Sequence, residues 1–123
     1  MKVEVNERQN TLSLIFHLEE EDLPQPTERY RMGGNRCDFV LPEGVSLREI
    51  HPDHIALVII MLCSPFCKGK MHLPGGVSKR FYEATKVFSR FEVVPADCAV
   101  EPYESPIDSR PALAFSGGVD STA

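Results

Sequence analysis

The stretch that decides the expected fold is Thr11-Leu12-Ser13-Leu14-Ile15-Phe16-His17-Leu18. Its leucines and phenylalanine recur at every second position, a period that is typical of a β-strand with one face on a core. Upstream, Val3 and Val5 alternate with charged residues in the same way, and the polar residues 7–10 predict a turn between the two stretches. We therefore expect the chain to begin with two adjacent antiparallel strands.

Further strands are predicted downstream of this pair. The acidic run Glu19–Asp22 and the two prolines that follow it interrupt the alternation, and residues 28–32 and 36–41 then flank Gly33-Gly34-Asn35. Glycine and asparagine readily adopt the positive φ angles of a tight hairpin. Residues 3–41 are therefore expected to form a four-stranded antiparallel β-meander.

A helix is expected to follow over residues 52–63. Pro52 suits the first helical position, where its missing N–H would be unpaired in any case, and Asp53 is favoured at the positive end of the helix dipole. The run from Ile55 to Cys63 is apolar on every side, so we expect this helix to be enclosed on most of its surface. A central strand is the alternative for a run so rich in Val and Ile, but its length and its proline start favour a helix.

A second helix is predicted to begin after Ser78, a favourable N-cap residue. Val77, just before the cap, can pack on Tyr82 as a hydrophobic staple. Residues 69–76 are expected to be a loop and residues 91–94 a short strand. The helix carries an apolar stripe that should face the core, formed by Phe81, Ala84, Thr85 and Phe88.

These elements indicate an α+β fold in which an N-terminal antiparallel β-meander packs on two helices. We assign residues 1–94 to this domain. Residues 95–110 form a proline-rich connector, since Pro, Asp, Glu and Ser dominate its composition. Residues 111–123 are expected to start a second, incomplete α/β domain, because Ala112-Leu113-Ala114-Phe115 is a short apolar strand that leads directly into a glycine loop.

The glycine loop, Ser116-Gly117-Gly118-Val119-Asp120-Ser121, has the composition of a polyphosphate site. Two glycines let backbone N–H groups approach phosphate oxygens closely, and the flanking serines add hydroxyl donors. Ser121 and Thr122 are suited to begin a helix whose positive end faces the same anion. Asp120 is expected to bind Mg²⁺, since a carboxylate beside phosphates is a common ligand of that ion. No lysine follows the glycines, which excludes the kinase-type P-loop.

Residues 114–122, Ala-Phe-Ser-Gly-Gly-Val-Asp-Ser-Thr, resemble the PP-loop of the N-type ATP pyrophosphatases, a superfamily also described as adenine nucleotide alpha hydrolase-like. The resemblance implies that this segment binds the pyrophosphate part of ATP with Mg²⁺ on Asp120. The implied ATP-binding residues are Ser116, Gly117, Gly118, Val119, Asp120, Ser121 and Thr122.

The resemblance also implies a reaction. Members of this superfamily adenylate an oxygen of their substrate, release pyrophosphate, and let ammonia, sulfur or another nucleophile displace AMP. A ligase similar to 7-cyano-7-deazaguanine synthases is our first expectation, and a tRNA-modifying or sulfur-transfer enzyme is the alternative. A binding or scaffold domain with a relic loop is a third possibility. Since such a nucleotide fold needs more chain than residues 111–123 supply, we expect a fragment of a larger enzyme that is inactive alone.

The composition limits the expected cellular location and the expected classes of binding partner. The net charge of −5 argues against a dedicated nucleic-acid binder, which is usually basic. The longest apolar run, residues 55–63, is about half of what a membrane-spanning helix needs. No secretory signal is visible and the four cysteines are irregularly spaced, so we expect reduced thiols and a cytoplasmic location without a membrane partner.

Three weaker patterns carry competing interpretations. The basic residues between Lys68 and Arg90 could face RNA, although a solvated basic surface is the simpler interpretation. His51-Pro52-Asp53-His54 could orient an imidazole for catalysis, but helix capping is favoured. A zinc site is one interpretation of Cys63, Cys67, His72, His51 and His54. The simpler interpretation is that Cys63 packs in the core.

Overall fold

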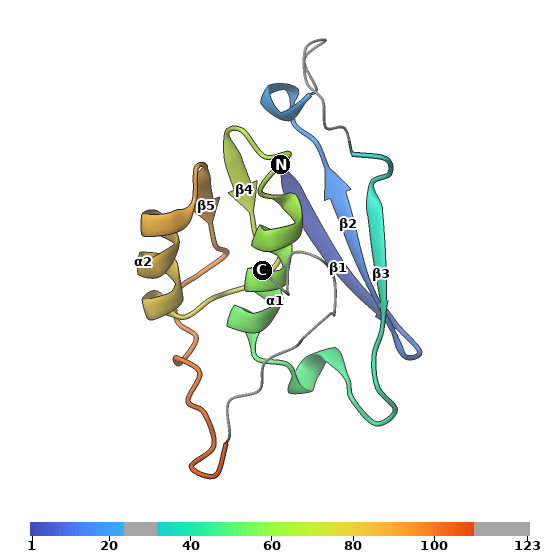
Figure 1. Cartoon of the computed structure of the whole chain (residues 1–123), viewed down its shortest axis with the longest axis vertical. Coiled ribbons are helices and arrows are strands. Elements are labelled where there is room, and N and C mark those ends of the chain that lie inside the picture. Colours follow the sequence, from blue (N-terminus) through green and yellow to red (C-terminus); the bar gives the residue numbers. More distant parts are fainter. Residues whose placement is uncertain (24–31, 110–123) are drawn as a thin grey trace, which may run out of the picture.

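The computed structural model of the chain describes residues 1–23 and 32–109. Its core is a five-stranded sheet with strand order β3-β2-β1-β4-β5, and two helices cover one face of that sheet (Figure 1). The mixture confirms the expected α+β class. The elements are β1 (Lys2–Arg8), β2 (Thr11–His17), the short 3-10 helix η1 (Glu20–Asp22), β3 (Arg36–Val40), the 3-10 helix η2 (Leu47–Glu49), α1 (Pro52–Cys63), β4 (Lys70–His72), α2 (Lys79–Phe88) and β5 (Glu92–Val94).

The first three strands form the predicted antiparallel meander. β1 pairs with β2 from Lys2↔His17 to Arg8↔Thr11, and β2 pairs with β3 on its other side. Met32 lies outside any strand, and the rest of the predicted strand at 28–32 falls outside the described residues.

The sheet is nevertheless not purely antiparallel, which corrects the expected four-stranded architecture. β4 pairs parallel with β1 and with β5, so the sheet is mixed. β4 lies within the predicted loop 69–76, which is thereby corrected: Lys-Met-His is too short to display a period of two. The short strand predicted at 91–94 is confirmed as β5.

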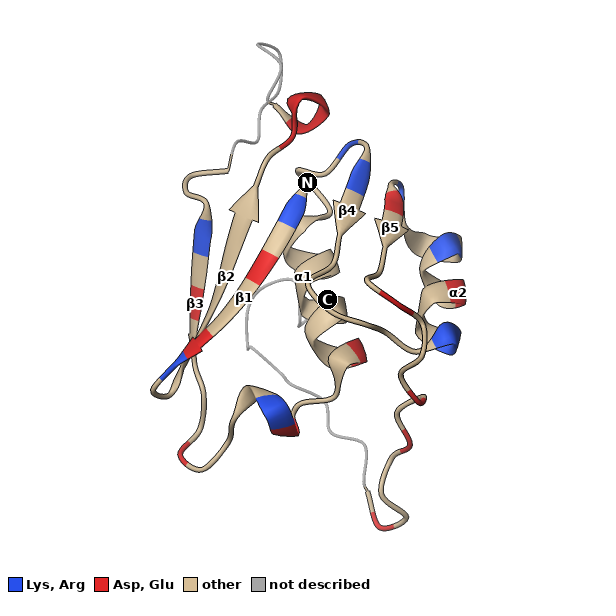
Figure 2. Cartoon of the chain, turned by 180° about the vertical axis from the view of Figure 1, so that it is seen from behind, with Lys and Arg blue, Asp and Glu red and all other residues tan. Residues whose placement is uncertain are grey.

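Two crossover connections place the helices in a layer on the sheet. The chain passes from β3 through α1 to β4, and from β4 through α2 to β5, moving in the same direction across parallel strands. Because such crossovers are right-handed, both helices come to lie on one face of the sheet (Figure 1). The opposite face carries charged pairs, among them Lys2 with Glu4 and Arg36 with Asp38 (Figure 2). The described part of the chain is thus a two-layer domain.

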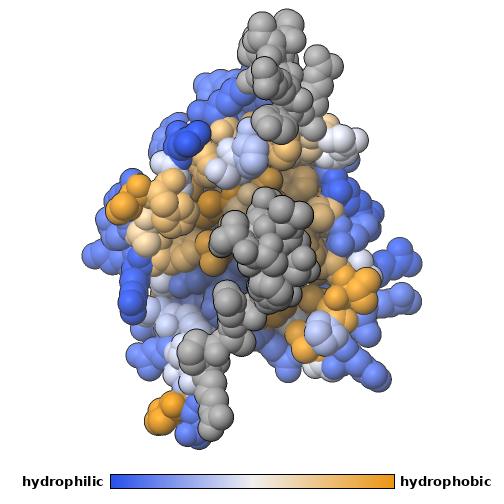
Figure 3. Space-filling model, viewed as in Figure 1, coloured by the Kyte–Doolittle hydropathy of each residue, from blue (hydrophilic) through white to orange (hydrophobic). Residues whose placement is uncertain are grey.

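The boundaries of α1 match the prediction, but its expected enclosure is wrong. One side of the helix, with Ala56, Ile59, Ile60 and Cys63, is buried against the sheet. The other side faces away from the sheet because, among residues 1–23 and 32–109, the sheet is the one layer that packs on α1. Figure 3 shows apolar surface on this side of the molecule. The exposed fractions lie between 38% and 70% for Leu57, Val58, Met61 and Leu62.

The predicted start of α2 is also confirmed. Ser78 caps the helix, since its hydroxyl accepts a hydrogen bond from the backbone N–H of Phe81 at 3.0 Å. Val77 and Tyr82 both join the core, as the predicted staple requires. The predicted stripe is buried only in part: Thr85 is buried, whereas Ala84 and Phe88 are exposed. Ala84 and Phe88 are exposed because α2 packs over β5 at the edge of the sheet, where no further strand of the described residues covers them.

Candidate functional site

The predicted ATP-binding residues, Ser116 through Thr122 with the magnesium ligand Asp120, lie outside the described residues. The apolar strand Ala112–Phe115 does so as well. These assignments therefore stay predictions. What the structure describes is the domain in front of the loop, with most of the connector that leads to it.

A buried polar cluster in this domain joins the N-termini of the two helices. Asp53, in the first turn of α1, is buried and accepts two hydrogen bonds from Ser78, the N-cap of α2. The backbone N–H of Ser78 donates to Oδ1 at 2.7 Å, and its hydroxyl donates to Oδ2 at 2.6 Å. The same hydroxyl accepts from Phe81 N–H, so each polar atom of the pair has a partner.

His51 extends this cluster toward the connector. Its Nδ1 accepts a hydrogen bond from the backbone N–H of Asp53 at 3.2 Å, which makes His51 the N-cap of α1. Its Nε2 lies 3.0 Å from the carbonyl oxygen of Glu101. A nitrogen that faces a carbonyl must donate, so these contacts require the neutral tautomer with the proton on Nε2. The predicted capping role of the His51–His54 segment is confirmed.

Aromatic contacts complete the attachment of the connector. The ring of Tyr103 lies 4.4 Å from the ring of His54 and 5.5 Å from that of His51, measured between centroids. Residues 95–109 contain no helix or strand of their own, as the composition predicted. The connector is nonetheless docked on the start of α1, which composition did not indicate.

This cluster does not have the arrangement of a catalytic triad. In a nucleophilic triad the serine hydroxyl donates to an imidazole, which then takes its proton. Here the Ser78 hydroxyl donates to the carboxylate of Asp53, and both ring nitrogens of His51 are occupied by backbone groups. The geometry therefore fixes two helices and a connector rather than activating a nucleophile. We call this arrangement the helix clasp, formed by His51, Asp53, Ser78, Glu101 and Tyr103.

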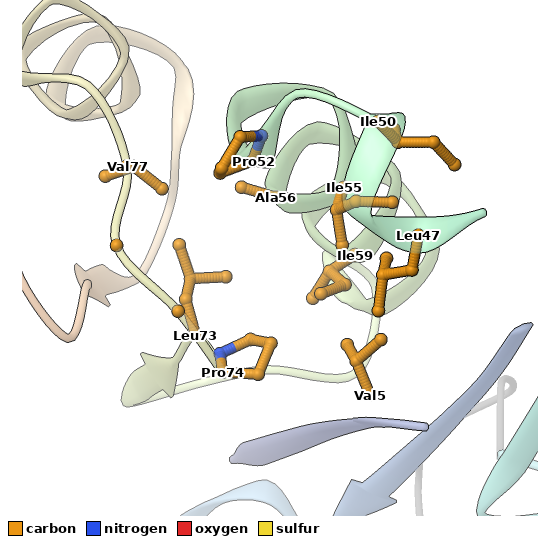
Figure 4. A pocket seen from close by; sticks show the side chains of 12 residues that line it. Val5, Leu47, Ile50, Pro52, Ile55, Ala56, Ile59, Leu73, Pro74 and Val77 are labelled. Atoms are coloured by element: carbon orange, nitrogen blue, oxygen red, sulfur yellow. The ribbon is translucent and has the colours of Figure 1, made fainter. Parts of the chain in front are cut away.

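Two pockets lie close to the helix clasp. One, of about 570 Å³, lies between α2 and the connector and is lined by charged and polar residues that include Arg80 and Glu104. The other, of about 290 Å³, is apolar and lies between α1, η2, β1 and the loop before α2 (Figure 4). Its lining includes Val5, Leu47 and Ile59 and no titratable side chain, so it suits an apolar group.

The amino group of Met1 forms a second buried polar centre, which the sequence does not predict. It lies 2.6 Å from Asp22 Oδ2 and 2.8 Å from Glu19 Oε2, and it donates to the carbonyl of Lys70 at 2.6 Å. Burial opposes the charge of the ammonium group, but the hydrogen bonds that it donates to Asp22 and Glu19 outweigh the effect of burial and raise the pKa of the amine. Burial likewise opposes ionisation of Asp22, and the ammonium group and two backbone N–H groups lower its pKa. In the sequence, the part of this centre that stands out is the acidic run Glu19–Asp22, and such a run by itself does not indicate a buried ion pair.

Cysteine and histidine residues do not assemble the possible zinc site. Within the described ranges, 1–23 and 32–109, no group of three His, Cys, Asp or Glu residues is placed to hold a metal ion. Burial raises the pKa of Cys63 to about 12 and that of Cys67 to about 11, so both thiols stay protonated. Cys63 packs in the core, as predicted.

The basic segment has ordinary surface partners. Lys70 pairs with Glu92 and Lys86 with Glu83, both at exposed positions. Phe81 and Tyr82 pack against the core instead of standing free for stacking on bases. Among the residues that the structure describes, no helix has the length and apolar composition needed to cross a membrane.

Compared with models of protein families, with curated proteins and with solved structures, the chain matches none.

Proposed function

We propose that this chain is the N-terminal part of an ATP-dependent adenylating enzyme of the PP-loop type. The observation that carries the proposal is the sequence of residues 112–122, an apolar strand followed by Ser-Gly-Gly-Val-Asp-Ser-Thr. The proposed reaction converts ATP to AMP and pyrophosphate while activating an oxygen of the substrate for attack by ammonia or another nucleophile. A carbonyl or carboxylate substrate is favoured, as in amide- or nitrile-forming ligases, with sulfur transfer to tRNA as the alternative.

Each residue of the loop has a defined role in this proposal. The backbone N–H groups of Gly117 and Gly118 and the hydroxyls of Ser116 and Ser121 bind the pyrophosphate part of ATP, and Asp120 binds Mg²⁺. Val119 and Thr122 complete the loop. Donors that hold the departing pyrophosphate stabilise charge that grows in the transition state, and this is how the loop would accelerate adenylation.

The described domain supports the proposal that the catalytic groups lie outside it. Its polar cluster, the helix clasp, has the hydrogen-bonding pattern of a structural junction, and its apolar pocket contains no titratable group. The catalytic groups are therefore assigned to the loop and to the chain beyond it. The domain in front has its own core and a connector attached at a defined point, which suits an accessory domain.

The test uses the protein translated from the complete reading frame that contains this chain. Incorporation of labelled pyrophosphate into ATP would be measured with Mg²⁺, a panel of carboxylate substrates and unmodified tRNA. Asp120→Ala should lower the exchange rate at least about 100-fold, because a metal ligand of the transition state is lost. Asp108→Ala, an exposed connector carboxylate, is the matched control and should leave the rate unchanged.

Exchange that survives Asp120→Ala would remove Asp120 from the mechanism. A complete protein with no exchange on any substrate, and no binding of Mg·ATP, would favour the alternative of a scaffold domain with a relic loop. Residues 1–123 alone are expected to show no exchange in either case.

A further inference from the structure

The apolar pocket between α1, η2, β1 and the loop before α2 lies at a place where sheets with parallel strands bind ligands. β1 and β4 are parallel neighbours, and the loop that lines the pocket, residues 73–77, begins directly after the carboxyl end of β4. From β1 the chain continues to β2 on one side, whereas β4 lies on the other side of β1. Connections diverge at such a reversal of strand order and leave a crevice beside the carboxyl ends of the parallel strands.

Small residues on two walls leave the space in this pocket. Ala56 is buried on the inner side of α1, one helical turn before the large side chain of Ile59. In the loop that follows β4, Gly75 and Gly76 carry no side chain at all. The larger side chains around these residues, among them Leu47 and Ile59, converge on an open volume of about 290 Å³ (Figure 4).

Hydrogen bonds hold both walls, so the pocket is formed before any ligand arrives. The carboxylate of Asp53 accepts two hydrogen bonds from Ser78 and thereby ties the first turn of α1 to the end of the loop. The loop is also paired with the chain after β5, because the N–H of Val77 donates to the carbonyl of Asp97 at 3.0 Å. A preformed pocket loses less conformational entropy on binding than one that must first be ordered.

The lining favours an uncharged, apolar ligand. It contains no titratable side chain, so a charged group would lose its hydration without gaining a partner. Water is held poorly at such a surface, since an ordered water needs several polar partners, and a ligand that displaces it gains affinity. The volume is about twice the roughly 150 Å³ of an engineered cavity that holds benzene, which suits one or two rings.

The rim of the pocket adds two backbone donors. Within residues 1–23 and 32–109, the N–H groups of Gly75 and Gly76 donate to no protein acceptor. Gly75 is also exposed, and a Cβ added to it would meet no atom within 4 Å, so the pocket is open beside it. A ligand with one acceptor atom at its edge can therefore be oriented by these donors while its ring packs inside.

We propose that the apolar pocket is a binding site for a small, uncharged ring compound, which enters beside Gly75 and packs on Ala56 and Ile59. The lining residues all precede the glycine loop in the sequence. Binding at this site therefore does not depend on the proposed ATP chemistry.

Methyl NMR on the chain 1–123, titrated with indole in the absence of nucleotide, measures the binding. We expect saturable shifts of the Ile55, Ile59 and Leu73 methyl groups, with a dissociation constant on the order of 0.1 mM for a ligand of this size. The methyl groups of Val87, exposed on α2, should not shift. Benzoate, a ring with a negative charge, should bind at least about tenfold more weakly than indole.

Two variants narrow the pocket from different walls. Ala56→Leu fills the space beside Ile59, and Gly75→Val adds a side chain at the rim, where its Cβ meets no atom within 4 Å. Each should weaken indole binding at least about tenfold, because the ligand and the new side chain compete for one volume. Gly34→Val is the matched control and should leave binding unchanged, since its Cβ also meets no atom within 4 Å and the position is outside the lining.

Unchanged indole binding in either folded variant, or no saturable binding to the wild type, would overturn the proposal. Shifts that fail to saturate and spread to the exposed Met61 methyl would also overturn it, because they indicate nonspecific contact with apolar surface. Gly75→Val keeps the test decisive if Ala56→Leu does not fold. These outcomes are independent of whether Asp120 is needed for pyrophosphate exchange.

Discussion

At the scale of single residues, the amino terminus is unusual because its charge lies inside the domain. The Met1 ammonium group is fully buried and is held by the Asp22 carboxylate, the Glu19 carboxylate and a backbone carbonyl. A buried charge without a partner is costly, so this cluster binds η1 to the end of the sheet only while both groups are ionised.

This pair predicts a defined dependence of stability on pH. The pKa of Asp22 is lowered in the folded state, so its contribution is present above its unfolded pKa and is lost as the pH falls through the folded value. The pKa of the Met1 amine is raised, so its contribution is present below its unfolded pKa and is lost as the pH rises through the folded value. Near neutral pH, Asp22→Asn should lower the free energy of unfolding by roughly 1.5–3 kcal/mol.

Urea unfolding followed by circular dichroism, on protein with an unextended amino terminus, measures this effect. The difference between wild type and Asp22→Asn should shrink at both acidic and alkaline pH. Glu20→Gln, at an exposed neighbouring position, is the control and should change little. A difference that is constant from acid to alkaline pH would exclude the ion pair as its cause.

At the scale of secondary-structure elements, the helix clasp joins α1 and α2 at their N-termini. Asp53 and Ser78 are 25 positions apart, yet each satisfies the other inside the domain. The two helices pack on different strands of the sheet, and this junction sets their relative position at one end.

A double-mutant cycle on Asp53→Ala and Ser78→Ala should therefore show strong coupling. Ser78→Ala removes an N-cap and leaves the Asp53 carboxylate buried with one partner fewer, which should lower the free energy of unfolding by about 2 kcal/mol. The coupling energy between the two changes should be on the order of 1–2 kcal/mol. The parallel cycle on Glu83 and Lys86, an exposed pair on α2, should give a much smaller coupling. Additive effects at Asp53 and Ser78 would show that the two helices are held together by other contacts.

At the scale of the whole molecule, one layer of helices on one face of a sheet creates the hydrophobic core of the described residues. Ile59 lies at its centre with no exposed surface and packs with residues of β1, β2 and β4 in one cluster. Ile59→Ala should lower the free energy of unfolding by about 2–5 kcal/mol, through lost burial and the cavity that remains.

The control for this prediction is Val87→Ala on α2, where the side chain is almost fully exposed. That change should alter the free energy of unfolding by less than about 0.5 kcal/mol. Thermal unfolding of both variants measures the contrast. Equal effects at the two positions would show that α1 is not packed on the sheet as described.

The sequence by itself determined the elements that local chemistry specifies. The period of two in residues 11–18, the proline start of α1 and the serine cap of α2 each act through neighbouring residues, so their positions could be predicted. The role proposed for the glycine loop also rests on consecutive residues, but it lies outside the described residues and stays a prediction.

Only the tertiary structure decided which contacts form between distant parts of the chain. β4 is too short to carry a pattern, and it becomes a strand because β1 and β5 pair on either side of it. α1 is apolar all round, yet one side stays exposed, because the number of layers packed on a helix is a property of the whole fold. The ion pair of Met1 with Asp22 and the docking of Tyr103 on His54 likewise join groups that local sequence does not relate.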